Sequence, residues 1–241
     1  MAGRIAYYGN IVKDGLVLLL DAAKKDSYPG SGTLWRDVSG NNLSGTLTNG
    51  PTFNSSNGGS IVFDGINDCV EFGDVLDLGT NSLTISHWVN ITTHSNQIFM
   101  SKGLAAAQNY RFATGLGFPV SNRLYGFMQG TSNPDITPYG STILPLNTWF
   151  MATYVFNRVS SIQIYYNGVL ETLTGNATIS QWNGLNFQSV NPFRIGSYTA
   201  SNNVGVVGSM NGRMGITQMY FRALSAQEVL QNYNATKNRY L

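Results

Sequence analysis

The chain has 241 residues, of which 42% are hydrophobic and only 11% charged, with 14 Lys and Arg against 12 Asp and Glu. This length allows one large domain or two small ones, and the hydrophobic fraction is high enough to bury a sizeable core. So few cations exclude a dedicated nucleic-acid binder, and so many aromatic and β-branched residues exclude a disordered chain. The single cysteine, Cys69, excludes an intrachain disulfide.

Short strand patterns separated by Gly, Asn, Pro and Ser clusters recur from end to end. Leu16–Asp21 is a nearly continuous apolar run, typical of a strand covered on both faces. Ser60–Asp64 and 69–72 together predict a short hairpin around residues 65–67. Residues 83–92 alternate, with Ile85, His87, Val89 and Ile91 on one side. Further strands are predicted at 97–101, 110–114, 123–128, 149–156, 161–166, 193–196 and 212–221.

One pair of residues predicts a hairpin turn with particular clarity. Asn167-Gly168 is the strongest two-residue hairpin signal, and it follows directly on the strand predicted at 161–166. The strand rhythm continues past it without a long polar linker. We therefore expect an N-terminal arm, residues 1–14, and one domain, residues 15–241. A dozen or so short strands in one domain predict an all-β, two-sheet antiparallel jelly-roll sandwich.

A single segment near the C-terminus is typical of a helix. Ser225 and Glu228 form a capping box, because the serine can accept from the backbone N–H three residues on and the glutamate can reach back. Val229, Leu230 and Tyr233 then fall on one face. The sequence therefore predicts one short C-terminal helix packed against a sheet edge or face.

A series of sequence blocks recurs in a recognisable order along the chain: 15–22, 27–33, 35–40, 45–53, 61–70, 83–89, 165–168, 193–196 and 212–225. Together these blocks resemble laminin G-like, concanavalin A-like lectin-type jelly-roll domains, as found in tailed-phage (cyanophage-like) virion structural proteins. The resemblance to phage proteins depends mainly on the first third of the chain. It implies a virion component that decorates the capsid or lies on a tail or fibre, often with glycan binding.

The resemblance leads us to expect a non-enzymatic phage virion surface protein. A capsid decoration protein with a lectin-like domain comes first, because the chain carries no fibre repeat or coiled-coil heptad. A tail or fibre adhesin that binds host surface glycans comes second, and a glycoside hydrolase is a distant third. The expected partners are other virion proteins and, for the adhesin, host surface polysaccharide, with no nucleic acid and no membrane insertion. We expect synthesis in the host cytoplasm and a place on the virion surface; the sequence leaves a homo-oligomer open.

The carboxylates argue against a hydrolase, which needs two of them flanking one bond. Enzymes of this fold class carry Glu-x-Asp-x-x-Glu on one strand, and the nearest run here is 71–77. Glu71 and Asp77 share strand parity with Gly73, not with a third acid. His87 and His94 are the only histidines, and a buried, hydrogen-bonded His87 is far more common than a catalytic base on such a strand. We expect no catalytic residues and no required cofactor.

Calcium is the one metal that the sequence makes worth considering. Asp64, Asn67 and Asp68 cluster around a tight turn and are candidate ligands, since calcium prefers several oxygen ligands. The alternative is that Asp64 and Asn67 hydrogen-bond their own turn. With only two carboxylates nearby, the second interpretation is favoured.

Glycan binding would use an aromatic ring against the apolar face of a sugar. Trp182, Tyr139 and Tyr198 lie in polar, turn-like contexts and are the candidate contacts for a glycan or a protein partner, with local packing as the alternative. The other three tryptophans lie on or beside predicted strands and are expected in the core: Trp35, Trp88 and Trp149.

Overall fold

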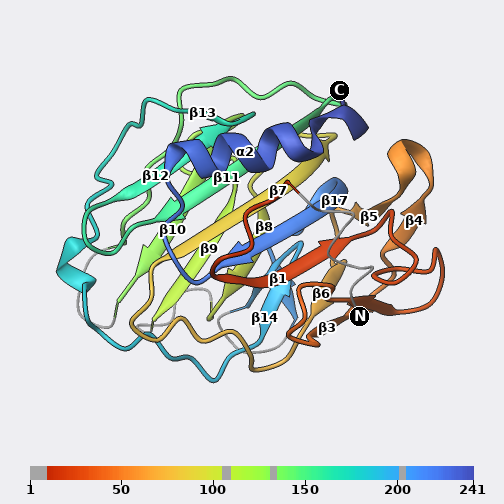
Figure 1. Ribbon diagram of the computed structural model, residues 1–241, viewed down its shortest axis with the longest axis horizontal. Helices are drawn as coiled ribbons and strands as arrows, with labels where there is room; N and C mark the ends of the chain where they lie inside the picture. Colours follow the sequence, from red (N-terminus) through yellow and green to blue (C-terminus); the bar gives the residue numbers. More distant parts are fainter. Residues whose placement is uncertain (1–9, 105–109, 131–134, 201–204) are drawn as a thin grey trace.

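The computed structural model describes residues 10–104, 110–130, 135–200 and 205–241. Within these ranges two antiparallel sheets form the body of the protein (Figure 1). Sheet A consists of β1 (Leu16–Asp21), β4 (Thr52–Asn54), β5 (Ser60–Asp64), β7 (Leu83–Ile91), β11 (Trp149–Phe156), β12 (Ile162–Tyr166), β13 (Val169–Leu170) and β17 (Asn211–Tyr220). Sheet B consists of β2 (Leu34–Arg36), β3 (Ser44–Thr48), β6 (Cys69–Glu71), β8 (Gln97–Lys102), β9 (Arg111–Leu116), β10 (Leu124–Gln129) and β14 (Phe193–Ile195).

The order of the strands confirms the two-sheet sandwich. Sheet A runs β13-β12-β11-β7-β17-β5-β4, with β1 also paired to β17, and sheet B runs β10-β9-β8-β14-β6-β3-β2. A separate two-stranded hairpin is formed by β15 (Tyr198–Thr199) and β16 (Val206–Val207). The helical elements of the described ranges are α2 (Ala226–Thr236) and three 3-10 turns, η1 (Ser56–Gly58), η2 (Ser180–Trp182) and η3 (Lys237–Arg239).

Two hairpins were predicted from turn residues, and the structure confirms one of them. Asn167 and Gly168 have φ values of 50° and 79° and join β12 to β13, which confirms the first, because this turn needs two positive φ angles. The hairpin predicted around residues 65–67 is wrong. β5 pairs with β4 and β17 in sheet A, whereas β6 pairs with β3 and β14 in sheet B. This turn therefore carries the chain from one sheet to the other.

The core lies between the sheets and is built on the alternation of β7. All nine residues of β7 are buried, since one face meets sheet B and the other meets α2. His87 points into the inter-sheet core, where its Nδ1 lies 3.2 Å from the Thr217 hydroxyl and its Nε2 3.3 Å from the Thr114 hydroxyl. The histidine is thus a satisfied core residue.

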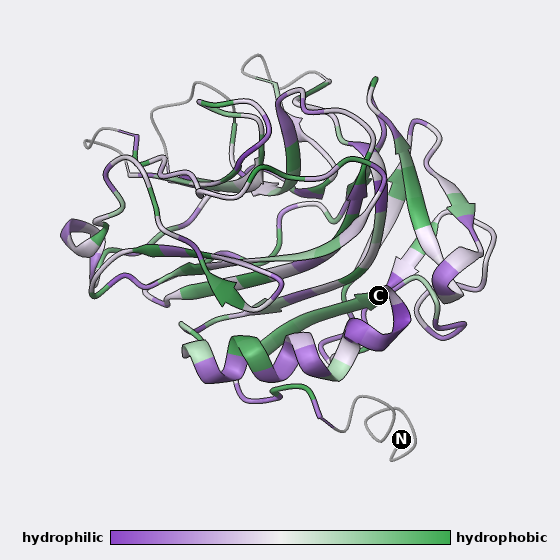
Figure 2. Ribbon diagram, turned by 90° about the horizontal axis from the view of Figure 1, so that it is seen from above, coloured by the Kyte–Doolittle hydropathy of each residue, from purple (hydrophilic) through white to green (hydrophobic). Residues whose placement is uncertain are grey.

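Helix α2 lies on the outside of sheet A (Figure 2). Its capping box is confirmed, because the Ser225 hydroxyl accepts from Glu228 N and the Glu228 carboxylate accepts from Ser225 N at 2.9 Å. The predicted apolar face is wrong at Leu230, which is 44% exposed. Asn232 is buried in its place and donates to the Tyr220 hydroxyl at 3.0 Å.

The last residues of the expected N-terminal arm pack on the same domain. Ile11 and Val12 are buried, and Val12 N donates to Asn232 Oδ1 at 2.8 Å. Residues 1–9 lie outside the described part of the chain. Among the described residues, no helix has the length and apolar character that crossing a membrane requires.

Candidate functional site

A cleft of about 360 Å³ opens on the outer face of sheet B, over β8, β9 and β10 and beside the β15–β16 hairpin. Residues at alternate positions of these strands face the core instead, among them Phe112, Leu124 and Met128. The volume is in the range of small-molecule sites. Its lining is Asn96, Ile98, Arg111, Ala113, Phe118, Tyr125, Phe127, Asp135, Tyr198, Val207 and Gly208.

Small residues on β9 create the hollow. Ala113 lies opposite Phe127 on β10, and Gly115 lies opposite Tyr125. A Cβ at Gly115 would collide with the Gln97 carbonyl oxygen and lie 3.2 Å from the Tyr125 ring. The glycine therefore lets two strands and a tyrosine ring approach closely. The rings of β10 consequently meet small neighbours across the ladder to β9.

The aromatic rings of the cleft are held in place by packing. Tyr125, Phe127 and Tyr198 are only 3%, 8% and 7% exposed, since they pack on one another and on Ile98 and Ala113. Phe118 is different, because it is 47% exposed at the rim and meets the Tyr125 ring edge-on at 5.8 Å. The cleft thus offers buried rings along its wall and one free ring at its mouth.

Its polar groups centre on Arg111. The guanidinium lies 4.7 Å from the centre of the Phe127 ring, 3.6 Å from the Asp135 carboxylate and 3.2 Å from the Leu104 carbonyl oxygen. It also donates to Gln129, its partner across the β9–β10 ladder. The Asp135 side chain is half exposed and faces solvent.

Burial keeps the tyrosines neutral. It raises the pKa of both Tyr125 and Tyr198 well above the usual 10, because the charged form loses its solvation; the nearby Arg111 charge only moderates the effect at Tyr198. The Tyr125 hydroxyl donates to Asn96 Oδ1 at 3.3 Å. These hydroxyls are suited to hydrogen bonding and not to acting as bases.

The β15–β16 hairpin is fastened to the sheet at several points. Ile98 N donates to the Gly208 carbonyl at 2.7 Å, and Arg194 donates to the Thr199 hydroxyl at 3.0 Å. Arg194 is itself bound to Glu71 at 2.7 Å. These bonds fix Tyr198 at the wall of the cleft.

The three aromatic contacts expected from sequence have different positions. Tyr198 lines the cleft. Tyr139 packs against the aromatic cluster beside the cleft, and its backbone forms an isolated antiparallel β-bridge with that of Tyr125. Trp182 is fully buried, 6.0 Å from Phe187, which corrects its assignment as a contact: the polar SQWNG segment forms the short turn η2 and directs the indole into the core. Trp35, Trp88 and Trp149 are core residues as expected.

Sequence reasoning missed most of the cleft. Arg111 and Asp135 gave no motif, and Tyr125 and Phe127 were placed within a predicted strand without attention to their face. Their shared parity on β10, opposite Ala113 and the glycine on β9, was the available signal.

The candidate calcium ligands hold their own turn. Asp64 Oδ1 accepts from Ile66 N at 2.8 Å, and Asp68 Oδ2 accepts from Asp64 N at 3.0 Å. The Asn67 carbonyl oxygen accepts from Asn49 at 2.9 Å. Asp68 Oδ1 is buried without a partner, and burial raises the pKa of this carboxyl. In the described ranges no three His, Cys, Asp or Glu side chains group as metal ligands would.

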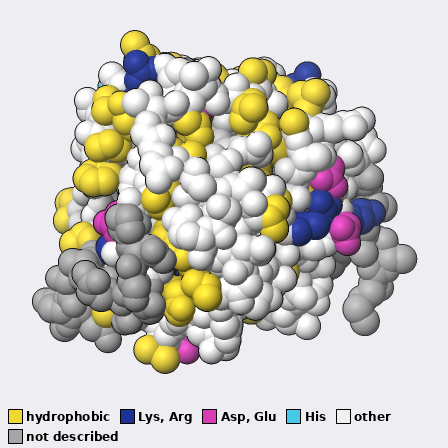
Figure 3. All heavy atoms as spheres, turned by 90° about the vertical axis from the view of Figure 1, so that its left-hand side faces the viewer, with side chains coloured by type: hydrophobic (Ala, Val, Ile, Leu, Met, Phe, Trp, Pro, Cys, Tyr) yellow, Lys and Arg dark blue, Asp and Glu magenta, His cyan; other side chains and the backbone are white. Residues whose placement is uncertain are grey.

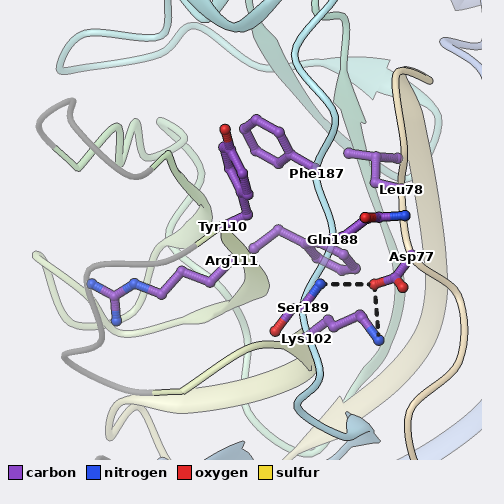
Figure 4. Close-up of a pocket in the computed structure, with 9 residues that line it drawn as sticks. Asp77, Leu78, Lys102, Tyr110, Arg111, Phe187, Gln188 and Ser189 are labelled. Atoms are coloured by element: carbon purple, nitrogen blue, oxygen red, sulfur yellow. Dashed lines mark hydrogen bonds and ion pairs between the residues drawn. The ribbon is translucent and has the colours of Figure 1, made fainter.

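A second, smaller hollow lies where β8 meets the segment 187–189 (Figure 4). The Lys102 ammonium bridges Asp74 at 2.9 Å and Asp77 at 3.3 Å, and Asp77 also accepts from Ser189 N. Its volume of about 10 Å³ holds at most one water. Figure 4 shows the Arg111 side chain extending away from Lys102 and Asp77. The carboxylates of the 71–77 run serve local ion pairs, Glu71 with Arg194 and the two aspartates with Lys102.

Charged side chains are few on one face of the molecule. The face in Figure 3 is mostly polar and uncharged, with scattered hydrophobic side chains and a few Lys, Arg, Asp and Glu. This surface agrees with the low charged fraction of the sequence. Recognition on it must depend on hydrogen bonds and apolar contacts more than on net charge.

Comparisons with known proteins agree with this architecture. The structure is similar to the binding domain of Paraclostridial Mosquitocidal Protein 1, with a TM-score of 0.69 and 18% identity over 92% of this chain and 52% of that one. It is also similar to the botulinum neurotoxin serotype G binding domain, with a TM-score of 0.65 and 16% identity over 90% of this chain and 50% of that one. The chain thus spans about half the length of these toxin domains.

One similar structure matches over nearly its whole length. This is Domain 4 of AbnA, a GH43 extracellular arabinanase from Geobacillus stearothermophilus, solved in complex with arabinotriose, with a TM-score of 0.65 and 15% identity over 90% of this chain and 98% of that one. Such identities show the fold alone. No curated protein sequence matches the chain. The profile of the Laminin_G_3 family matches residues 64–230, and the chain therefore belongs to this family of the concanavalin A-like lectin/glucanases superfamily.

Proposed function

We propose that this chain is a non-enzymatic carbohydrate-binding protein and that the cleft on sheet B holds the sugar. The observation that carries the proposal is the composition of the cleft, about 360 Å³ walled by aromatic rings with a few polar groups among them. A sugar ring presents C–H groups on its faces and hydroxyls around its edge. Aromatic rings such as Phe118 complement the faces, and groups such as Asp135 and Asn96 complement the edge.

The carboxylates of the cleft support binding without hydrolysis. Asp135 is the one carboxylate among the described residues of its lining. Glycoside hydrolysis needs two, about 5 to 9.5 Å apart. The similar structures also point this way, since two are named as toxin binding domains and the third is an arabinanase domain solved with arabinotriose.

The finer proposal places the protein on a phage particle. It is supported by the resemblance of the first third of the chain to phage virion proteins. Capsid decoration is our first choice, with a tail or fibre adhesin as the alternative. Either position would multiply a weak sugar site through many copies. Labelling intact virions with an antibody to this chain separates the two, since label on the head supports decoration and label confined to the tail overturns it.

Binding itself is tested with arabinotriose and a glycan array, using the purified chain and two variants of the cleft. Phe118→Ala removes the exposed ring, and Val207→Trp places an indole at a rim position that is 43% exposed. Each is expected to weaken binding about tenfold or more, since stacking is lost in one and the entrance is blocked in the other. Val190→Trp is the matched control, because Val190 is 86% exposed and lies outside the cleft.

The outcomes are distinct. Glycan binding that falls in both cleft variants and persists in Val190→Trp supports the site. Binding that persists in both cleft variants moves the site elsewhere. A blank array for the unmodified chain overturns carbohydrate binding, and release of reducing sugars from a bound polymer overturns the non-enzymatic assignment.

A further inference from the structure

We infer that the cleft on sheet B selects uncharged sugars and excludes those that carry a carboxylate or a sulfate. This inference depends on the proposed function, since it names the class of sugar that the same cleft accepts. It follows from the two charged side chains of the cleft, Arg111 and Asp135, and from how differently they are exposed.

The cation is not available to an acidic ligand. The Arg111 side chain is only 9% exposed, and its guanidinium is shared among Asp135, the Leu104 carbonyl oxygen and Gln129, with the Phe127 ring beneath it. An anionic sugar would have to displace one of these partners to pair with it. Because Arg111 is nearly buried, breaking those contacts would leave a partner unpaired.

The anion, in contrast, faces the ligand. The Asp135 side chain is 49% exposed, and its ion pair with Arg111 spans 3.6 Å; among the described residues no other ion pair engages this carboxylate, so its remaining acceptor positions suit sugar hydroxyls. Hydroxyls that donate to a carboxylate form the stronger, charge-assisted class of hydrogen bond. A carboxylate or sulfate at the same place would meet a like charge, and such contacts suppress wrong partners.

Among the described residues that line the cleft, no third charge opposes this preference. All other described lining residues are uncharged. The three internal segments outside the described ranges, 105–109, 131–134 and 201–204, contain no Asp, Glu, Lys or Arg in the sequence. The charge that a ligand meets is therefore set by Asp135.

The experiment compares matched ligands on the full chain. A glycan array with neutral, uronic, sialylated and sulfated glycans is followed by titration of each bound neutral glycan against its counterpart with one added carboxylate. We expect the bound glycans to be uncharged and the acidic counterpart to bind about tenfold more weakly or worse, with a smaller difference at high salt.

Two variants attribute the preference to one side chain. Asp135→Asn keeps hydrogen-bonding capacity without the charge, and we expect the difference between neutral and acidic glycans to fall below about threefold. Asp14→Asn is the matched control, because it makes the same change of charge at an 86% exposed residue that pairs with Arg222 beside sheet A. That variant is expected to keep the full difference, and thermal melts check that both fold.

Each outcome is decisive. Acidic glycans that bind as well as neutral ones, or a preference that survives in Asp135→Asn, overturn the selectivity and leave carbohydrate binding standing. No binding to any glycan overturns the proposed function, and the selectivity with it.

Discussion

The imidazole Nε2 of His87 on β7 lies 3.3 Å from the hydroxyl of Thr114 on β9, so a polar contact joins the two sheets inside the core. The other ring nitrogen meets Thr217 on β17 at 3.2 Å. Phe99 and Tyr154 flank the ring edge-on. The strand that places Thr114 in the core places Arg111 and Ala113 in the cleft, so the contact also supports the floor of the site.

This buried histidine predicts a loss of stability in mild acid. Burial lowers the pKa of His87 from 6.5 to about 3. The unfolded chain therefore takes up this proton near pH 6.5, whereas the folded chain stays neutral down to about pH 3. The free energy of unfolding is therefore highest above pH 6.5 and falls as the pH drops toward 3, because only the unfolded chain binds this proton. The expected loss between pH 7 and pH 5 is about 2 kcal/mol. Urea unfolding at the two pH values measures it.

The two histidines provide their own comparison. His87→Gln is expected to be less stable at pH 7 but to lose most of the pH dependence between 7 and 5. His94→Gln should keep the pH dependence, since His94 is only partly buried, outside the core, where it hydrogen-bonds the Leu144 carbonyl oxygen. A full pH dependence in His87→Gln would show that another group is responsible.

A second prediction concerns two buried tyrosine hydroxyls. The Tyr198 hydroxyl makes no hydrogen bond of normal geometry and has only the Arg111 guanidinium close by, whereas the Tyr220 hydroxyl donates to the Val12 carbonyl oxygen at 3.0 Å and accepts from Asn232 at 3.0 Å. Tyr198→Phe is expected to leave the free energy of unfolding unchanged or higher, because an unsatisfied buried group is removed. Tyr220→Phe should cost about 1–2 kcal/mol. Equal losses in chemical denaturation would contradict the prediction.

Substitutions at Trp182 and Phe118 should have opposite effects, the first on stability and the second on glycan binding. Trp182→Ala removes a fully buried indole and is expected to destabilise the protein by about 3–5 kcal/mol, through the cavity that it leaves. Its effect on glycan affinity should be small in the folded fraction. Phe118→Ala, at an exposed position, should change stability by about 0.5 kcal/mol or less while it weakens binding. Melting curves and glycan titrations of both variants test the pair, and a stable Trp182→Ala would argue against this core.

The capping box of α2 predicts a second loss of folding stability, at a lower pH than the loss caused by His87. Hydrogen bonds from Arg222 and the bonds at Ser225 lower the pKa of Glu228 from 4.5 to about 2. Because the folded pKa lies below the unfolded one, this stabilisation is present above pH 4.5 and is lost as the pH falls to about 2. Glu228→Gln should cost about 1 kcal/mol at pH 7, a figure kept low because the ion pair is partly solvated. The difference from the unmodified chain should shrink toward pH 2, and a constant difference would exclude the charge as its cause.

Calcium is expected to leave the melting temperature unchanged. The Asp64 carboxylate accepts from Ile66 N and the Asp68 carboxylate from Asp64 N, so both already bond within their own turn. Melting in excess calcium and in chelator measures any binding to the native state, because such binding must raise its stability. A higher melting temperature in calcium, abolished in Asp68→Asn, would assign a metal site to this turn.

Local signals in the sequence predicted the elements that local chemistry decides. The run Leu16–Asp21 became β1 with its bounds unchanged, and Asn167-Gly168 became a turn because few other residues adopt two positive φ angles in succession. Ser225 and Glu228 capped α2 for a similar reason. The short edge strands β2, β4 and β13 were not predicted, since three residues or fewer carry no period to recognise.

Other features depended on which strands become neighbours. The sequence of residues 65–67 is typical of a hairpin turn, yet β5 and β6 belong to different sheets. β5 pairs with β17 and β6 pairs with β14, and both partners lie far along the chain. Trp182 read as a loop aromatic, yet the Arg158 guanidinium binds the Trp182 and Leu185 carbonyl oxygens and holds this turn against the core.

By itself, then, the sequence determined an all-β sandwich with one capped helix, because strand period, turn residues and caps act within a few residues of the chain. The tertiary structure alone decided the cleft. Its groups come from β8, β9, β10 and the β15–β16 hairpin, and only the pairing of these strands and the packing of the hairpin on them bring these groups together.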